Sequence, residues 1–345
     1  MIVDRYYYNQ LSKDEKTVYK AFYNGVMAHK DIIPVPMKGN VPDDLFQKVF
    51  RAITLDNPLI YYLNQSACHF AFDSFGNAAI CPQYFFSEDT VKDYNKRIEK
   101  AVNGIAAKLK LTEGSEYDKE LKVHDWICEN VSYDTKGHDM NDLARFISAH
   151  NIIGVFAHHK AQCEGIAKAV KVLLNAVDVK CIVATGNAIG NGQNGPHAWN
   201  IVKIDDKAYH MDMTWDIGAN QGKAVKKSSN GRIVYDYFNV TDKQLFLTHT
   251  PDDKLPVCTA TDANYVRRNK MYFSSKSRAL SYVEASLKNG ITEFNLCLNE
   301  KISLTGMEEA MKVAIHDYLR TSSHIGGSVV NSINDKMRII WMKVV

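Results

Sequence analysis

The stretch HAWNIVKIDDKAYHMDMTWD, residues 197–216, decides the fold of this chain. Residues 197–204 and 208–214 are predicted to form two antiparallel strands joined by a short turn. If the loop contains two residues, His197 and Asp212 lie on the same face as diagonal neighbours, ~7–8 Å apart at the backbone and within side-chain reach. A loop of odd length would put Asp212 on the opposite face and separate the pair.

A histidine and an aspartate in this arrangement suit acid–base chemistry. The carboxylate fixes the tautomer of the imidazole and stabilises the imidazolium, which is the orienting role in a nucleophile–base–orienter triad. A structural His–Asp hydrogen bond within a sheet is the alternative interpretation of the same residues.

A cysteine upstream has the position expected of a nucleophile. The segment KAQCEGI, residues 160–166, introduces a helix predicted over 161–176, so Cys163 falls in its first turn. There the helix dipole and unpaired N–H groups favour the thiolate, and a nearby histidine helps to lower a thiol pKa from ~8.5 toward ~3.5–7.5. The alternative is a small buried hydrophobic residue, as most cysteines are. The apolar residues that follow lie on one helical face: Ile166, Val170, Leu173, Leu174 and Val177.

Three short motifs, in this order, carry a family resemblance. They are C-x-G from residue 163, H-A-W from residue 197 and D-x-T-W from residue 212. Together they resemble the core of the transglutaminase-like superfamily, over roughly residues 121–252. The resemblance implies a papain-like α+β core, with a nucleophile helix packed on an antiparallel sheet. It also implies a triad in which Cys163 is the nucleophile, His197 the base and Asp212 the orienter.

The resemblance also suggests residues for the rest of the cleft. The backbone N–H of Cys163 is expected to donate one hydrogen bond to the oxyanion. Tyr133 resembles the position where the family presents an oxyanion-stabilising aromatic, with a partly buried core tyrosine as the alternative. Gln162 stands where small or apolar residues are frequent, and its amide either lines the site or caps the helix. Trp199 and Trp215, from the second and third motifs, are further cleft candidates.

Outside the core, two flanking regions are predicted. Residues 1–110 read as an N-terminal helical and hairpin region, in which Ser12 and Glu15 form a capping-box pattern. Residues 111–254 form the transglutaminase-like core, and residues 255–345 give strand–helix–strand–helix–strand, a small α+β appendage. The predicted fold class is therefore α+β throughout.

Further core segments are predicted from local pattern. Residues 179–185 and 235–240 are expected to be strands, and the polar residues 218–232 a solvated loop. The glycine-rich residues 186–192 superficially resemble a phosphate loop, but lack its G-K-[ST] ending, so a flexible loop beside the cleft is expected.

Composition excludes several classes of protein. The 345 residues have a formal net charge of +3, 46% hydrophobic and 23% charged residues, which is ordinary globular usage and too balanced to indicate nucleic-acid binding. No apolar run approaches the ~18 residues of a membrane span. No secretory leader is visible at the start, which favours the cytoplasm unless a leader has been removed.

The sequence gives no sign of a metal site or a cofactor. The seven cysteines lie at least thirteen residues apart, so no C-x-x-C motif is present, and they are expected to be reduced and mostly buried. His158-His159 has no ligand pair at zinc spacing and is expected in a solvated loop, while His124 and His210 have no partner visible in the sequence.

The predicted function is thiol-dependent acyl transfer on a peptide or protein amide through a thioester intermediate. Cysteine peptidase or amidase activity is favoured, because hydrolysis is the commoner inference for bacterial members of the superfamily, to which this chain is compared by analogy. A protein-glutamine transglutaminase, with an amine as acceptor, is one alternative. A non-catalytic module that binds a polypeptide or a glycan on the same fold is another.

Overall fold

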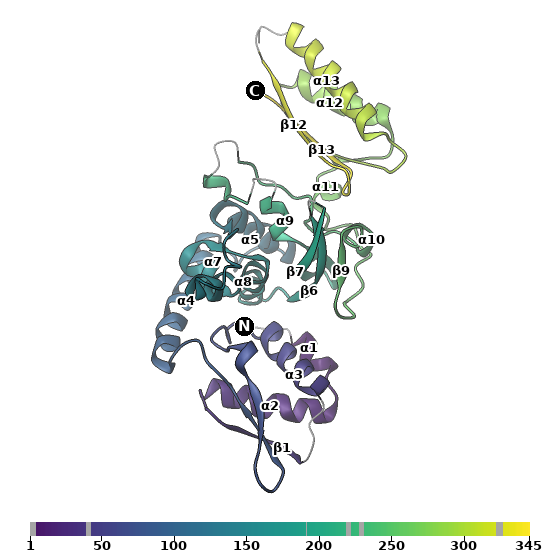
Figure 1. Ribbon diagram of the computed structural model, residues 1–345. Helices are drawn as coiled ribbons and strands as arrows, with labels where there is room; N and C mark the ends of the chain where they lie inside the picture. The colour runs from purple at the N-terminus through teal and green to yellow at the C-terminus, as the bar shows by residue number, and fades with distance from the viewer. Residues whose placement is uncertain (1–4, 39–42, 191, 219–221, 228–230, 322–326) are drawn as a thin grey trace.

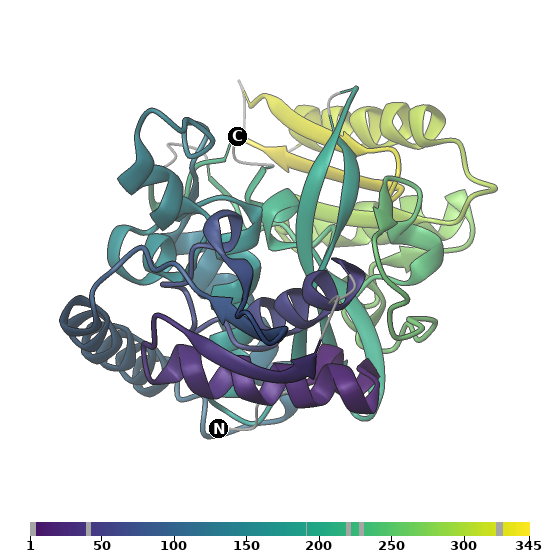
Figure 2. The same cartoon turned by 60° about the horizontal axis from the view of Figure 1, so that its bottom comes forward.

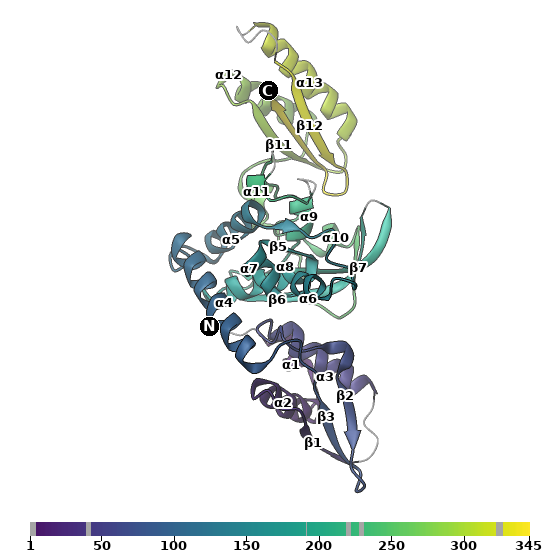
Figure 3. The same cartoon turned by 60° about the vertical axis from the view of Figure 1, so that its left-hand side comes forward.

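The computed structural model describes residues 5–38, 43–190, 192–218, 222–227, 231–321 and 327–345. Figure 1 shows three tiers: the N-terminal elements in purple at one end, the central elements in teal and green, and the C-terminal elements in yellow at the other end. The same order is seen in Figure 3. Helices and sheets occur in all three tiers, so the predicted α+β class is confirmed.

The N-terminal tier is built from helices and a small antiparallel sheet, with strand order β1-β3-β2. Figure 2, in which this tier comes forward, shows its helices beside the sheet. Ser12 accepts the N–H of Glu15 while the Glu15 carboxylate accepts the N–H of Ser12, which confirms the predicted capping box. The elements are α1 (Tyr6–Gln10), α2 (Lys13–Met27), β1 (Ile33–Lys38), α3 (Asp43–Asp56), η1 (Gln65–Ala67), β2 (His69–Phe72) and β3 (Asn77–Cys81).

The central tier packs a buried helix on a four-stranded antiparallel sheet. The helix is α8, and the sheet has the strand order β8-β7-β6-β9. The elements are α4 (Glu88–Lys108), α5 (Glu116–Asn130), β4 (Ser132–Tyr133), α6 (Leu143–Ala149), α7 (Ile152–His158), β5 (Lys160–Ala161), α8 (Cys163–Asn175), β6 (Cys181–Gly190), β7 (Gln193–Ile204), β8 (Lys207–Met211), α9 (Met213–Gly218), η2 (Val225–Lys227), α10 (Asp242–Leu245) and β9 (His249–Pro251).

The apolar face predicted for α8 is buried, and Ile166, Val170 and Leu173 are each at most 1% exposed. Burying side chains of this size contributes about 1.5–3 kcal/mol each. They belong to a hydrophobic cluster that also contains Phe22 and Ile53 of the N-terminal tier. The N-terminal tier and the centre therefore share one core, and the predicted division into three domains stays a prediction.

The C-terminal tier has a hydrophobic cluster of its own, formed where α12 and α13 cover one face of a four-stranded sheet. The sheet order is β10-β11-β13-β12. The predicted strand–helix–strand–helix–strand pattern is present, but β12 was missed because it is an exposed edge strand, VVNSIN, with little apolar alternation. The elements are α11 (Tyr265–Arg268), β10 (Tyr272–Phe273), α12 (Lys276–Lys288), β11 (Glu293–Leu298), α13 (Leu304–Thr321), β12 (Val329–Asn334) and β13 (Ile339–Val344).

The structure corrects three local predictions in the core. The glycine-rich stretch after residue 185 continues β6 and pairs with the start of β7, so the described part of it is not a loop. β8 ends at Met211 rather than at residue 214, because α9 begins at Met213. Residues 235–240 form turns rather than a strand: Asn239 has a φ of 55°, and only Val240 pairs with a strand residue, His210.

Two further outcomes concern polar segments. Of the predicted loop at 218–232, residues 219–221 and 228–230 lie outside the described residues, and η2 occupies part of the rest. Residue 191 also lies outside them.

Among the described helices, none has the length and apolar composition of a membrane span.

Candidate active site

Cys163 is the first residue of α8, as predicted, and Gln162 is the N-cap. Gly165 permits the close approach of the end of α6, because a Cβ there would lie 2.5 Å from the carbonyl oxygen of Ala149. All seven cysteines are described and are free thiols; Cys163 is partly exposed, while four others are buried. The helix start therefore presents this thiol to a space that solvent reaches.

β7 brings His197 to the thiol, and the strand register brings Asp212 to His197. The pairing of Ile204 with Lys207 confirms the two-residue loop. The His197 imidazole donates from Nε2 to Asp212 Oδ2 at 2.7 Å, and the nearby Cys163 side chain helps to raise the pKa of His197. Asp212 itself follows the end of β8, where its Oδ1 accepts the first free N–H groups of α9.

Opposite charges stabilise each other in this pair. Burial by itself lowers the pKa of His197, but the charge and hydrogen bond of Asp212, together with Cys163, outweigh it and raise the pKa to about 10. Burial by itself raises the pKa of Asp212, but His197 and then His249 hold it well below its usual range. At neutral pH the pair is therefore an imidazolium and a carboxylate.

A cleft of about 720 Å³ opens over Cys163 and His197. One wall comes from α3 of the N-terminal tier, and the other walls come from the core. Arg51 of α3 forms ion pairs with Asp252 and Asp253 of the core. The cleft thus lies between two tiers, and the N-terminal region forms part of it.

Tyr133 and Gln162 line this cleft, whereas Trp199 and Trp215 are not among its lining residues. Burial, followed by the charges of Cys163 and Asp212, raises the pKa of Tyr133 to about 12, so its phenol stays protonated at neutral pH. The Gln162 amide donates to the carbonyl of Asp134 at 3.2 Å and does not cap α8. Their catalytic roles, like those of the triad, stay predictions.

The two tryptophans lie behind the imidazole. Trp199 is 1% exposed, stacks near His197 with 6.3 Å between ring centroids, and donates from its indole N–H to His210 Nδ1 at 3.1 Å. The Trp215 ring lies 6.2 Å from His197 and 4.7 Å from His249. Both rings therefore pack against the two imidazoles that contact Asp212.

His249 is the site residue that the sequence analysis missed. Its Nε2 lies 3.0 Å from Asp212 Oδ2, and its side chain is fully buried. It comes from β9, 37 residues beyond Asp212, within a short His-Thr-Pro strand. No local spacing connects the two residues, so only the fold brings them together.

Other histidines have partners that the sequence did not reveal. His124 Nε2 is 3.1 Å from Asp216 Oδ2, and His210 Nε2 is 2.8 Å from Asp242 Oδ1. His158 ends α7, and His159 follows it with a φ of 52°, so this pair terminates a helix rather than lying in a free loop.

Two groups of described residues bring metal-ligating atoms within 4.8 Å of one another. In each group, hydrogen bonds already join the histidine to the aspartate. Each offers three protein ligands, fewer than the four of a structural zinc site. The groups are His197, Asp212 and His249, and His210, Asp242 and Cys258.

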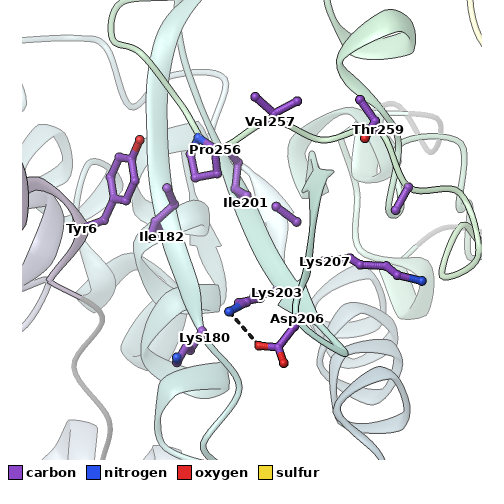
Figure 4. A pocket seen from close by; sticks show the side chains of 12 residues that line it. Tyr6, Lys180, Ile182, Ile201, Lys203, Asp206, Lys207, Pro256, Val257 and Thr259 are labelled. Carbon is purple, nitrogen blue, oxygen red and sulfur yellow. Dashed lines mark ion pairs between the residues drawn. The ribbon is translucent and has the colours of Figure 1, made fainter.

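A separate pocket of about 490 Å³ lies on the face of the β6–β7–β8 sheet, between Tyr6 and the segment around Pro256 (Figure 4). Its floor includes Ile182 and Ile201. Lys203, at its rim, is paired with Asp206 at 2.8 Å. None of the Cys163, His197 and Asp212 side chains lines it.

Comparison with known families agrees with this geometry. Residues 103–213 match the model of the transglutaminase-like superfamily. This region of the chain belongs to that superfamily. The matched transglutaminase-like region contains Cys163, His197 and Asp212. The match supports a papain-like α+β core and chemistry of the cysteine peptidase or transglutaminase type.

Relatives of the transglutaminase-like region are distant. Kyphoscoliosis peptidase of Mus musculus is 23% identical over 167 residues, which cover 46% of this chain and 24% of that protein. The Homo sapiens protein of the same name is 26% identical over 139 residues, covering 37% and 20%. This chain therefore spans about a quarter or less of these relatives. A crystal structure of a TGase aligns with a TM-score of 0.30 at 14% identity, covering 53% of this chain and 50% of that one.

Proposed function

We propose that this protein is a cysteine hydrolase that cleaves an amide bond of a peptide or protein through a thioester on Cys163. One observation carries the proposal. A thiol at a helix N-terminus lines the same cleft as an imidazole whose Nε2 donates to a buried carboxylate, and the thiol contributes to the raised pKa of that imidazole. This is the constellation required for an activated nucleophile.

In the first half-reaction, the Cys163 thiolate attacks the carbonyl carbon of the scissile amide. Because Nε2 of His197 is held by Asp212, Nδ1 remains for the thiol and the leaving group. In this proposal the backbone N–H of Cys163, which has no partner within α8, donates to the oxyanion, and the protonated phenol of Tyr133, which lines the same cleft, is the second donor. The tetrahedral intermediate collapses, the C–N bond breaks, and the His197 imidazolium gives its proton to the leaving amine.

In the second half-reaction, neutral His197 takes a proton from water, and the resulting hydroxide attacks the thioester carbonyl. The C–S bond breaks, the carboxylic acid leaves, and the thiolate–imidazolium pair is restored. Asp212 stabilises the imidazolium in the resting enzyme and keeps the imidazole oriented throughout. An amine in place of water would give transamidation, because the first half-reaction is shared.

Alkylation of Cys163 tests whether the thiol is activated. We expect iodoacetamide to label Cys163 rapidly at about pH 6–7, as read by peptide mass mapping, and His197→Ala to lose this fast labelling. Slow labelling with the same pH profile in both proteins would contradict the proposal and favour a non-catalytic binding module.

Substrate assays then separate hydrolysis from crosslinking. We expect release of new amino termini from unfolded protein substrates or peptide libraries, with no incorporation of a labelled primary amine. Incorporation of the amine into glutamine side chains, without new termini, would identify a transglutaminase. Cys163→Ala is the control in both assays.

A further inference from the structure

Asp212 accepts hydrogen bonds from two imidazoles at one carboxylate oxygen. His197 donates to Oδ2 at 2.7 Å and His249 donates to the same atom at 3.0 Å. The other oxygen, Oδ1, accepts the backbone N–H groups of Thr214 at 3.0 Å and Trp215 at 3.3 Å. A carboxylate has about four acceptor positions, so these four donors occupy all of them.

The backbone that carries His249 is held firmly against the sheet. β9 pairs with β6 through Gly186, Asn187 and Ala188, and the adjacent N–H groups of Ile189 and Asp252 extend the ladder. A Cβ at Gly186 would lie 2.1 Å from the carbonyl oxygen of Thr250, so only glycine lets β9 approach this closely.

The ring of His249 is fixed by aromatic neighbours. Its centroid lies 5.2 Å from Trp199, 4.7 Å from Trp215, 6.4 Å from Tyr237 and 5.2 Å from His197. On its far side, Nδ1 lies 2.9 Å from Thr248 Oγ1. Among the described residues, these contacts bring the charged groups Asp212 and His197 to the ring, and the titratable His210, which packs on the same Trp199 ring, is near enough for the charge of His249 to lower its pKa.

The Thr248 hydroxyl suits either protonation state of the ring. It lies 3.2 Å from the carbonyl oxygen of Leu245, to which it can donate while it accepts from Nδ1–H. Turned the other way, it donates to an unprotonated Nδ1. In both states Nε2 keeps its proton and donates it to Asp212.

We propose that His249 is a positioning residue of the active site, which holds the Asp212 carboxylate in the orientation that aligns His197 with Cys163. The inference rests on the proposed function, since it assigns a residue to the same site. Without His249, one acceptor position of Oδ2 is empty in a dry environment, and the carboxylate is free to turn away from His197. The carboxylate then stabilises the His197 imidazolium less well.

A matched pair of variants tests this role. In His249→Gln, the amide nitrogen reaches the position of Nε2 and can donate to Asp212; in His249→Asn, the shorter side chain cannot. We expect His249→Asn to slow alkylation of Cys163 at about pH 7 by tenfold or more and to move the alkaline limb of the rate profile to lower pH. We expect His249→Gln to stay within threefold of the wild type, with both limbs unmoved.

Two controls make the outcomes decisive. His124→Asn removes another fully buried histidine that contacts none of the three active-site side chains, and we expect it to leave the pH profile unchanged. Wild-type rates in His249→Asn, or equal losses in both His249 variants, would overturn the positioning role but not the proposed function. Ordinary thiol behaviour of the wild type would overturn the proposed function itself.

A measurement on the wild-type protein covers the case in which His249→Asn does not fold. In protein labelled with ¹⁵N-histidine, NMR reports directly which ring nitrogens carry protons. We expect Nε2 of both His197 and His249 to be protonated and protected from exchange, and Asp212→Asn to perturb both signals. An unprotonated Nε2 on His249 cannot donate to Asp212, and that result would overturn the proposal.

Discussion

Two of the sets of cysteine, histidine and aspartate in this protein, one around Cys163 and one around Cys128, differ in ways that bear on function. In the first, Cys163 and His197 line a cleft and Asp212 lies behind them. In the second, Cys128 Sγ lies 3.9 Å from His124 Nε2, and Asp216 Oδ2 lies 3.1 Å from the same nitrogen. All three side chains of the second set are buried.

Three physical differences separate these sets. Cys163 begins a helix, whereas Cys128 lies in the last turn of α5, where the helix dipole disfavours a thiolate. Burial raises the pKa of the Cys128 thiol. In the second set the thiol and the carboxylate share one imidazole nitrogen, so no separate nitrogen remains to transfer a proton between thiol and substrate. The three residue types alone therefore do not make a reactive site.

The largest expected effect comes from removing the Cys163 thiol, with removal of the Cys128 thiol as the comparison. Cys163→Ala should lower amide hydrolysis by about 10⁴-fold or more, because no covalent intermediate can form. Cys128→Ala should leave kcat/KM within about threefold, since its thiol meets no substrate. Steady-state kinetics on one amide substrate checks both variants, and a large loss in Cys128→Ala would break the comparison.

Replacing the carboxylates gives the next largest effect. Asp212→Asn should lower kcat by about 10²–10⁴-fold, because an amide N–H facing His197 favours the wrong tautomer. Asp216 accepts the N–H of Tyr237 and pairs with His124, so Asp216→Asn should mainly lower the free energy of unfolding, by about 1–3 kcal/mol. Kinetics and urea denaturation distinguish the variants, and equal kcat losses would contradict the assignment.

The pH dependence of stability should separate His197 from another histidine, the buried His210. The pKa of folded His197 is about 10, above its usual ~6.5, so its stabilising contribution is complete below ~6.5 and is lost as the pH rises through 10. Burial lowers the pKa of His210, so its contribution grows as the pH rises and is complete above ~6.5.

Urea denaturation at about pH 6, 8 and 10 measures these contributions as differences from wild type. We expect the destabilisation in His197→Gln to shrink by a few kcal/mol across this range, and that in His210→Gln to persist. Asp212 also stabilises the folded protein, because its pKa is lower in the folded than in the unfolded state. This contribution is lost as the pH falls well below ~4, which sets the acid limit of the stabilisation by the His197–Asp212 pair. A constant difference for His197→Gln would mean that its imidazolium is not stabilised in the folded protein.

The smallest expected effect on reactivity comes from Trp199→Phe. This change removes the indole N–H that His210 Nδ1 accepts, but leaves an aromatic ring behind His197. We expect the free energy of unfolding to fall by about 1–3 kcal/mol and the alkylation rate of Cys163 to change by less than threefold. A tenfold slower rate at unchanged stability would place Trp199 in the chemistry instead.

Local pattern was sufficient for much of the architecture. Helical spacing after Cys163 predicted α8, and the two aspartates after Ile204 predicted the turn that sets the β7–β8 register. The spacing of apolar side chains indicates which face of a helix or strand is buried, and a short loop allows few strand registers. Both features depend on residues that are close together in the sequence, so they can be predicted from it. Local pattern was insufficient in two places: the glycine-rich residues after 185 continue β6 as a strand, and β8 ends at Met211 because α9 begins at Met213.

Contacts between segments that are distant in the sequence could not be predicted from local pattern. His249 meets Asp212 because β9 pairs with β6 at Gly186, and Arg51 reaches the cleft because α3 packs on that strand. The sequence by itself determined the helix start that presents Cys163 and the hairpin that aligns His197 with Asp212, since both depend on local periodicity and turn length. Only the tertiary structure decided which cysteine faces a cleft and which histidine shares the carboxylate, because burial and hydrogen bonding between remote segments depend on how the whole chain packs.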